Sequence, residues 1–337
     1  MERERKEYIS FLNIIACYSV VLMHCNGSFW TKTAGADWWF ANFMETTCYF
    51  AVPVFFMLTG VTLLDYPERY STKIYFIKRL KKAFIPFLVW STISYGYQYC
   101  ISMRHGEIMN EKPLQVIDNI VNARYMSVYW FFIPLFSIYL AIPVLAKIKD
   151  KESVFIYASI IGFLFNSVLP LVLNLMGLSM NTTWVPGTVS GQLFLPMLGY
   201  VLAKKNFQRK QRVIVYVAGV CGWILHFAGT AIVSTGSEIN TIFKGDYNLP
   251  AVLWASAIFV FVKHNVNKKN KIVDWFAKRT FGIYLIHMYL IIICSKVLCI
   301  NLDLPVMKIV CGTGIFVVGA GIIFGMQKIA VVREVVP

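Results

Sequence analysis

The stretch YISFLNIIACYSVVLMHCN, residues 8–26, decides the fold of this chain because it is long, mainly apolar and free of charged side chains. A helix rises about 1.5 Å per residue, so about 20 such residues cross the hydrocarbon core of a bilayer. The charged segment MERERKE precedes it at residues 1–7. This pattern predicts a first membrane-spanning helix near residues 9–26.

The rest of the 337-residue chain has a similar character. Hydrophobic residues make up 58% of it and charged residues only 15%, whereas about a quarter of a soluble domain is charged. This composition excludes a soluble globular protein and favours an all-α, polytopic integral membrane helix bundle with a single domain over residues 1–337. We predict about ten transmembrane helices, near residues 9–26, 43–64, 83–101, 129–146, 154–176, 188–203, 213–233, 249–262, 281–299 and 306–326.

The net charge of +15 follows this predicted topology. If the N-terminus is cytoplasmic, twenty-five Lys and Arg residues fall in the inside segments and five in the outside segments. Such an excess of inside positive charge is the usual orientation signal of membrane proteins. It predicts that both termini are cytoplasmic and that the inside surface attracts anionic membrane lipid. The charge therefore requires no nucleic acid.

Two polar residues of the first predicted helix are candidates for function. Asn13 and His24 are eleven positions apart, which at 100° per residue places them on one face, separated by roughly 16 Å along the axis. Polar and ionisable groups inside a bilayer are costly and commonly mark functional sites. His24 is therefore a candidate base in a cavity of the bundle. The alternative is a histidine that only forms a hydrogen bond between helices.

Further candidates come from other predicted spans. Glu45 begins the second span, where it can orient His24 if the two helices are adjacent, or can lie in water as an interfacial charge. Tyr284 and His287 lie in FGIYLIHMYL of the ninth span and are candidate substrate contacts, with packing as the alternative. The topology places His287 in the inner half of the membrane. The eight cysteines form no CxxC pair, so we expect free, packing thiols and no metal site.

A basic cluster stands where the third predicted helix enters the membrane. The segment KIYFIKRLKKAFIPF brings Lys78, Arg79, Lys81 and Lys82 together at its inner end. Such residues anchor helices by extending their charged groups to the membrane surface. The alternative is that they bind the phosphates of a ligand, because clustered Arg and Lys suit phosphate groups.

Several segments together resemble the membrane-bound acyltransferase family 3. This family includes bacterial cell-surface polysaccharide and peptidoglycan O-acyltransferases and the membrane domain of the vancomycin-resistance serine racemases. The matching segments occur in the family's order over most of the chain: YISFLNIIACYSVVLMHCNGSFW, VPVFFMLTGVTLL, FIKRLKKAFIPFLVW, YWFFIPLFSIYLAIPVL, FLPMLGYVLAKK and FGIYLIHMYLII.

The resemblance implies transfer of an acyl group, commonly acetyl, from cytoplasmic acyl-CoA to a hydroxyl of a glycan or lipid-linked sugar at the bacterial cytoplasmic membrane. His24 matches the family's proposed catalytic histidine, which takes the proton of the attacking hydroxyl. Arg79 and Lys82, with Lys78 beside them, match a basic pair proposed to bind CoA. Glu45 is then a residue that orients His24, and Trp130 stacks on a sugar.

The chain departs from the family pattern at two positions. Asn13 replaces an arginine that many members carry eleven positions before the histidine, so it offers a cofactor contact by hydrogen bonding without a charge. Val128 stands where a histidine often precedes the fourth-span tryptophan, here Trp130. These changes suit a subgroup with another acceptor or with altered cofactor contacts. Lys82, in place of an arginine, keeps the charge but lacks the bidentate fork.

Two other classes of function stay open at this point. A membrane transporter or flippase would use the polar first helix as a path for a small solute or an acyl group, and paired broken helices in two halves would favour it. We find no such repeat among the prolines. A purely structural scaffold would depend on neither His24 nor the basic cluster. The acyl group, the acceptor and the oligomeric state are left open by the sequence.

Overall fold

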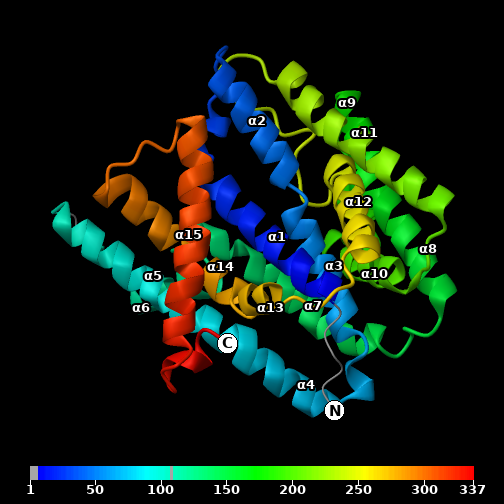
Figure 1. Cartoon of the computed structure of the whole chain (residues 1–337), viewed down its shortest axis with the longest axis horizontal. Helices are drawn as coiled ribbons and strands as arrows, with labels where there is room; N and C mark the ends of the chain where they lie inside the picture. The colour runs from blue at the N-terminus through cyan, green and yellow to red at the C-terminus, as the bar shows by residue number, and fades with distance from the viewer. Residues whose placement is uncertain (1–6, 107–108) are drawn as a thin grey trace.

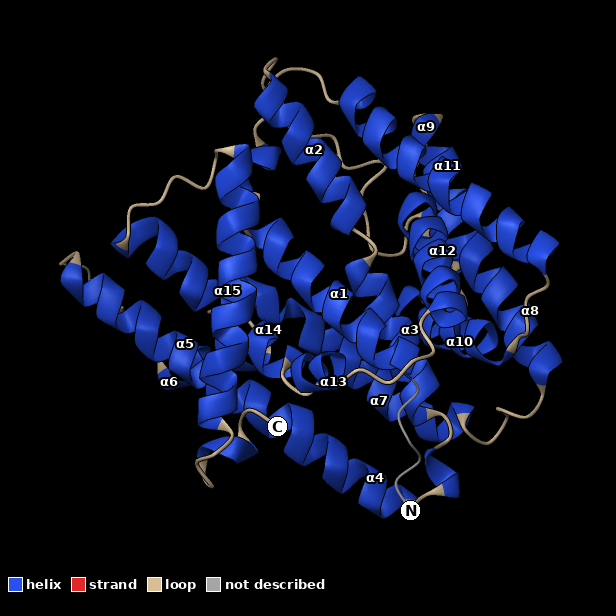
Figure 2. Cartoon of the chain, in the orientation of Figure 1, coloured by secondary structure: helices blue, strands red, loops and turns tan. Residues whose placement is uncertain are grey.

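A computed structural model describes residues 7–106 and 109–337. This part of the chain is mainly helical, and the only strand-like pairing in it is a single bridge between Thr31 and Glu238 (Figure 2). The predicted all-α bundle is confirmed. The α-helices are α1 Glu7–His24, α2 Ala36–Cys48, α3 Ala51–Leu63, α4 Thr72–Arg79, α5 Ile85–Arg104, α6 Pro113–Val121, α7 Phe132–Leu145, α8 Glu152–Phe163, α9 Leu169–Leu175, α10 Gly191–Lys204, α11 Arg209–Val233, α12 Leu249–Asn265, α13 Lys271–Ala277, α14 Thr280–Ile292 and α15 Pro305–Met326.

Each predicted span coincides with helix in the structure. Among the described residues, seven helical segments are long and apolar enough to cross a membrane: Glu7–His24, Ala36–Glu68, Ser127–Leu145, Glu152–Leu175, Arg209–Val233, Thr280–Val297 and Pro305–Met326. The other three predicted spans fall on α5, α10 and α12. Of these, α10 has 14 residues and α12 has 17, fewer than the about 20 of a typical crossing. The protein is a multi-pass membrane protein.

Three short helices occur where the sequence indicated loops. The basic segment before the third span contains α4, which begins after Ser71, whose side chain accepts a hydrogen bond from the Ile74 amide. Asn270 caps α13 in the same way by accepting from the Ile272 amide at 2.8 Å. The third short helix, α6, begins at Pro113. These helices were missed because they are too short and too polar to resemble membrane spans.

Helix α1 occupies the centre of the bundle (Figure 1). It packs against α3, α12, α14 and α15, and its residues Leu12, Ala16 and Val21 have 0% exposure. Figure 1 shows α15 and α14 on one side of α1 and α3 and α12 on the other. Much of α1 is therefore enclosed by neighbouring helices.

Helices α3 and α10 cross in close contact next to α1. A Cβ atom added at Gly60 would lie 2.0 Å from the carbonyl oxygen of Pro196, and one at Gly199 would lie 2.5 Å from the Met57 backbone. Only glycine allows two helix backbones to approach this closely. The crossing holds α3, and the adjoining α2, in a fixed position beside α1.

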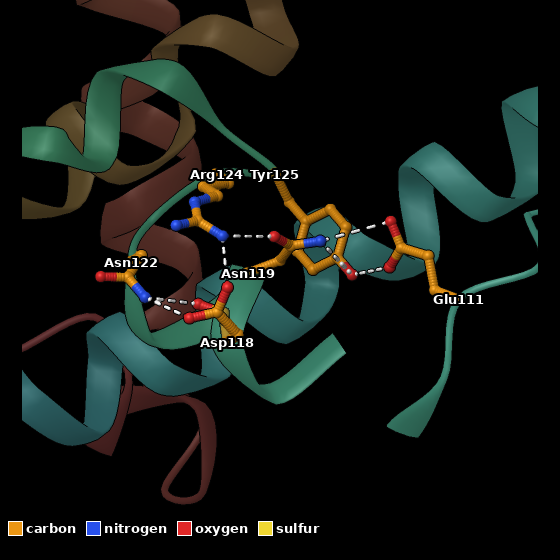
Figure 3. Close-up of polar contacts among 6 residues, drawn as sticks. All are labelled: Glu111, Asp118, Asn119, Asn122, Arg124 and Tyr125. Atoms are coloured by element: carbon orange, nitrogen blue, oxygen red, sulfur yellow. Dashed lines mark hydrogen bonds and ion pairs between the residues drawn. The ribbon is translucent and has the colours of Figure 1, made fainter. Parts of the chain in front are cut away.

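A polar network fixes the segment that leads from α6 to the 3-10 helix η4, Ser127–Phe131 (Figure 3). Tyr125 donates a hydrogen bond to Glu111, and the side-chain amide of Asn119 donates to the same carboxylate at 3.3 Å. Arg124 forms an ion pair with Asp118 on α6. The network closes the turn after α6, and so it determines where η4 lies against the rest of the bundle.

Candidate active site

His24 is the last residue of α1, and its side chain is exposed although its neighbours Leu22 and Cys25 are 8% and 1% exposed. Neither ring nitrogen of His24 forms a hydrogen bond within the part of the chain that the structure describes. The imidazole lies beside that of His287, with the ring centroids 5.2 Å apart. His24 is thus an exposed residue whose ring contacts that of His287 and forms no hydrogen bond to the described residues.

The relative depth of the two histidines differs from our expectation. We placed His287 in the inner half of the membrane and His24 in the outer half, yet the two rings are adjacent. The reason is the start of α14: the Thr280 carbonyl accepts a hydrogen bond from the Cys17 thiol at 3.3 Å, in the middle of α1. From Cys17 to His24 and from Thr280 to His287 are each seven residues, or about 10 Å of helix. Because α13 precedes α14, the first residue of α14 lies beside Cys17 of α1, and His287 reaches the level of His24.

His287 is completely buried, and one of its ring nitrogens is held. Its Nδ1 lies 2.6 Å from the Tyr284 carbonyl oxygen, an acceptor, so Nδ1 carries the proton and donates. Its Nε2 is left as an acceptor without a partner among the described residues. Tyr284 in turn donates its hydroxyl proton to the Val128 carbonyl, and Tyr129 donates to the Leu285 carbonyl at 2.8 Å. Helix α14 and η4 are thereby fixed together.

Glu45 belongs to a buried ion pair near His24. One of its oxygens is 2.5 Å from Lys244 Nζ, and both side chains are almost fully buried. Asn26 donates its side-chain amide proton to the other oxygen at 3.2 Å. Glu45 does not hydrogen-bond His24, but Glu45 and Lys244 are the charged groups whose fields act on the His24 ring. The orienting role that we predicted for Glu45 therefore has no direct hydrogen bond to His24 behind it.

A second buried lysine lies at the same end of α1. Lys308, in the first turn of α15, has 0% exposure and its Nζ contacts Ser28 Oγ at 2.5 Å. Glu45 is one of the carboxylates whose field acts on Lys308. We call the group formed by His24, Ser28, Glu45, Lys244 and Lys308 the polar nest.

A cavity of about 580 Å³ adjoins the polar nest through Lys244. Its other lining residues come from the end of α9 and from the loops before α10 and α12, and include Asn174, Ser179, Thr241 and Asn248. Asp246 lies in the same loop as Lys244. Burial raises the pKa of Asp246 to about 6, although the charge of Lys244 acts in the opposite direction. The cavity thus has polar walls and leads towards the Glu45–Lys244 pair.

Asn13 and Trp130, two of the residues predicted from the sequence, are not part of the polar nest. Asn13 is partly buried, and its side chain forms no hydrogen bond in the described part of the chain. Trp130, in η4, is 42% exposed and meets the edge of Phe131. Tyr284, by contrast, lies directly beside His287, with ring centroids 5.6 Å apart.

The basic cluster forms a separate site on α4 and the following π-helical turn η3, Leu80–Phe84. Arg79 is partly buried, with its guanidinium 5.4 Å from the centre of the Tyr139 ring. Its Nε is buried and has no partner among the described residues. Lys78 and Lys82 are exposed on an adjoining face of the same helix. The three cations lie together, and no carboxylate of the described residues pairs with them.

Sequence reasoning missed Ser28, Lys244 and Lys308 as members of the site. Lys244 lies in the loop between α11 and α12, and no local pattern indicates its ion pair because the partner is 199 positions away. Lys308 lies within or beside an apolar span, and a lysine in that position is a signal of function. Ser28 has no comparable signal, because its role depends on a contact across 280 positions.

The fold and site together define an integral membrane protein with a histidine, a buried ion pair and a separate cationic surface. The family model described as an acyltransferase domain matches residues 6–325. The chain therefore belongs to acyltransferase family 3, and it is a membrane acyltransferase. Neither the curated proteins nor the solved structures compared with it include a match.

Proposed function

We propose that this protein transfers an acyl group, with acetyl the first choice, from cytoplasmic acyl-CoA to a hydroxyl of a cell-surface glycan or lipid-linked sugar. The cell membrane is the proposed location. The observation that carries the proposal is the accessible imidazole of His24, free of hydrogen bonds to the described residues and set beside His287 and the buried Glu45–Lys244 pair. A histidine in such surroundings is suited to accept and return a proton.

The reaction requires His24 to act on the acceptor. The neutral imidazole takes the proton of the acceptor hydroxyl while the oxygen attacks the acyl carbonyl. An ester bond forms, the bond from the carbonyl carbon to the leaving group breaks, and the imidazolium returns its proton to the leaving group. The ring of His287 lies beside that of His24, and its Nε2 has no partner among the described residues.

The donor and the acceptor approach from different regions in this proposal. Arg79, Lys78 and Lys82 bind the phosphates of CoA, because clustered cations with free N–H donors suit phosphate oxygens. The acceptor sugar occupies the polar cavity at Lys244, where side-chain amides and hydroxyls can hydrogen-bond its hydroxyl groups. Trp130 provides an exposed aromatic face for a sugar ring.

The first test is acetyl-CoA binding to the purified protein in detergent, measured by calorimetry. A second measurement quantifies CoA released in the presence and absence of a short glycan acceptor. Saturable binding with acceptor-dependent release supports the proposal. A well-folded protein that neither binds nor cleaves acetyl-CoA contradicts it, and accumulation of a solute in proteoliposomes without CoA would then identify a transporter.

A further inference from the structure

Ser28 and Lys308 form a buried amine–hydroxyl pair that the proposed reaction does not use. Lys308 Nζ lies 2.5 Å from Ser28 Oγ, and the two residues come from α15 and from the 3-10 helix η1, Gly27–Trp30. Lys308 is completely buried, whereas Ser28 is partly exposed. Ser28 is therefore the member of the pair with exposed surface, and Lys308 is enclosed by protein.

The surroundings of Lys308 favour its action as a base. It forms no ion pair within the described residues, and Glu45, the carboxylate shared by the polar nest, is already paired with Lys244. Asp303 and Asp37 lie beyond ion-pair distance, and their fields favour the charged form of Lys308, so complete burial is what favours the neutral amine. A buried amine without a counter-ion next to a serine hydroxyl is the arrangement of Ser–Lys catalytic pairs.

The pair also lies close to His24. Ser28 follows His24 by four residues, just beyond the end of α1, and Glu45 acts on both His24 and Lys308. Cys25 is nearer in sequence, but it is 1% exposed and has no adjacent base among the described residues. Ser28 is thus the nucleophile of this region that is both accessible and held by a potential base.

We propose that Ser28 carries the acyl group as a covalent ester between donor and acceptor, with Lys308 as the base that activates its hydroxyl. In the first half, Ser28 Oγ attacks the thioester carbonyl, its proton passes to the Lys308 amine, the carbon–sulfur bond breaks, and the CoA sulfur leaves and takes up that proton. In the second half, His24 takes the proton of the acceptor hydroxyl, the acceptor oxygen attacks the acyl-Ser28 carbonyl, the bond from the acyl carbon to Ser28 Oγ breaks, and His24 gives its proton to Ser28 Oγ.

This inference rests on the proposed acyl transfer and specifies its route. Donor and acceptor need not be bound at the same time, because Ser28 holds the acyl group as an ester between the two half-reactions. Each half-reaction then has its own base, Lys308 for serine and His24 for the acceptor. The half-reactions can be separated by mutation, which makes the route testable independently of the acceptor's identity.

The experiment incubates detergent-purified protein with acetyl-CoA, quenches it in acid and locates the added acetyl group by peptide mass spectrometry. We expect the His24→Ala variant to accumulate acetyl on the peptide that contains Ser28, because its second half-reaction is slowed. The double variant His24→Ala/Ser28→Ala carries none. Ser19→Ala in the His24→Ala background is the matched control, since Ser19 is a buried serine of α1, and it retains the label.

Variants of Lys308 test whether it acts as a base or only as a structural cation. We expect Lys308→Met and Lys308→Arg both to slow acetylation of Ser28 at least about 100-fold, because neither thioether nor guanidinium accepts a proton at neutral pH. A thermal melt of each variant reports folding. Equal acetylation rates in folded Lys308→Arg and wild-type protein would show that Lys308 is not the base.

An activated ester, p-nitrophenyl acetate, tests Ser28 as the nucleophile independently of whether acetyl-CoA is the donor. If Ser28 is acetylated by this ester but acetyl-CoA is neither bound nor cleaved, the CoA assignment fails and the Ser28 assignment stands. If CoA-dependent transfer proceeds in Ser28→Ala at the wild-type rate and no labelled Ser28 is found in His24→Ala, the covalent route is wrong. Direct transfer catalysed by His24 would then be the mechanism, and the proposed function would stand.

Discussion

The polar nest and the basic cluster are built from similar charged residues in opposite ways. In the nest, Glu45 and Lys244 are buried and paired, and side chains from α1, α2, α15 and the loop before α12 are brought together. In the basic cluster, Lys78 and Lys82 are exposed, Arg79 contacts aromatic rings, and one turn and a half of a single helix supplies all three cations. One region is held by a buried ion pair, and the other has no carboxylate partner among residues 7–106 and 109–337.

This difference separates the expected roles of the two regions. Buried, paired charges hold a preorganised geometry, which suits a reaction that depends on the exact position of a proton. Exposed cations without carboxylate partners attract a mobile anion and cost little to the fold if they are removed. Substitutions in the nest are therefore expected to change chemistry or stability, and substitutions in the cluster to change ligand affinity.

The largest effect is expected for His24→Ala. Loss of the base lowers acyl transfer about 10²- to 10⁴-fold, while acetyl-CoA binding stays within about twofold because the phosphates bind elsewhere. Turnover by quantified CoA release and binding by calorimetry are the two measurements. His264→Ala, which removes an exposed histidine at the end of α12, is the control. Wild-type turnover in His24→Ala would refute the role of the nest in chemistry.

The next effect tests whether the nest is held by its ion pair. Lys244→Met leaves the buried Glu45 carboxylate without its partner, and we expect a loss of about 3 to 5 kcal/mol of stability. Glu45→Gln/Lys244→Met removes both charges and is expected to recover most of that loss. Thermal melts in detergent provide the comparison. Equal melting temperatures for Lys244→Met and wild type would mean that the pair contributes nothing to the fold.

The fold was largely predictable because hydropathy is a local property. Ten apolar ranges were found in the sequence, and each coincides with helix. Helices α4, α6 and α13 were not predicted, because seven to nine residues with mixed polarity leave no window of membrane-span length. Of these, α13 matters most for the site, since it sets the depth at which α14 begins.

The site was predictable only where one residue is unusual for its surroundings. His24 and His287 stand out because ionisable groups in apolar helices are costly, and the structure places their rings side by side. Their matching depth depends on the Cys17–Thr280 contact, which no local pattern encodes. Lys244 resembled an ordinary loop cation, and Ser28 an ordinary loop serine, because their partners are far away in the sequence.

Arg79→Ala tests the basic cluster and is expected to have a smaller effect. Loss of its hydrogen bonds to phosphate weakens acetyl-CoA binding by about 1.5 to 3 kcal/mol, or about 10- to 150-fold, with little change in the turnover of bound donor. Added salt is expected to weaken wild-type binding more than binding by the variant. Arg209→Ala, which removes an exposed arginine at the start of α11, is the control. Unchanged affinity in Arg79→Ala would assign the cluster to membrane anchoring.

The smallest effect concerns Asp246, the acidic neighbour of Lys244 at the edge of the nest. Because burial raises the pKa of this carboxyl from 3.8 to about 6 in the folded protein, the folded state binds its proton more tightly than the unfolded state. Its contribution to stability is therefore complete below about pH 4 and is lost as the pH rises through 6. Asp246→Asn, which cannot ionise, avoids that loss.

We expect Asp246→Asn to be more stable than wild type at pH 7.5 by about 1 to 2 kcal/mol, after allowance for the partial exposure of the side chain. The difference should shrink as the pH falls towards 4.5, and thermal melts at the two pH values measure it. Asp303→Asn, an exposed carboxylate in the loop before α15, should show no such trend. If Asp246→Asn is instead less stable than wild type at pH 7.5, the ionised carboxylate strengthens the nest as a second counter-charge to Lys244. Asp246 would then belong to the buried, paired charges of the polar nest.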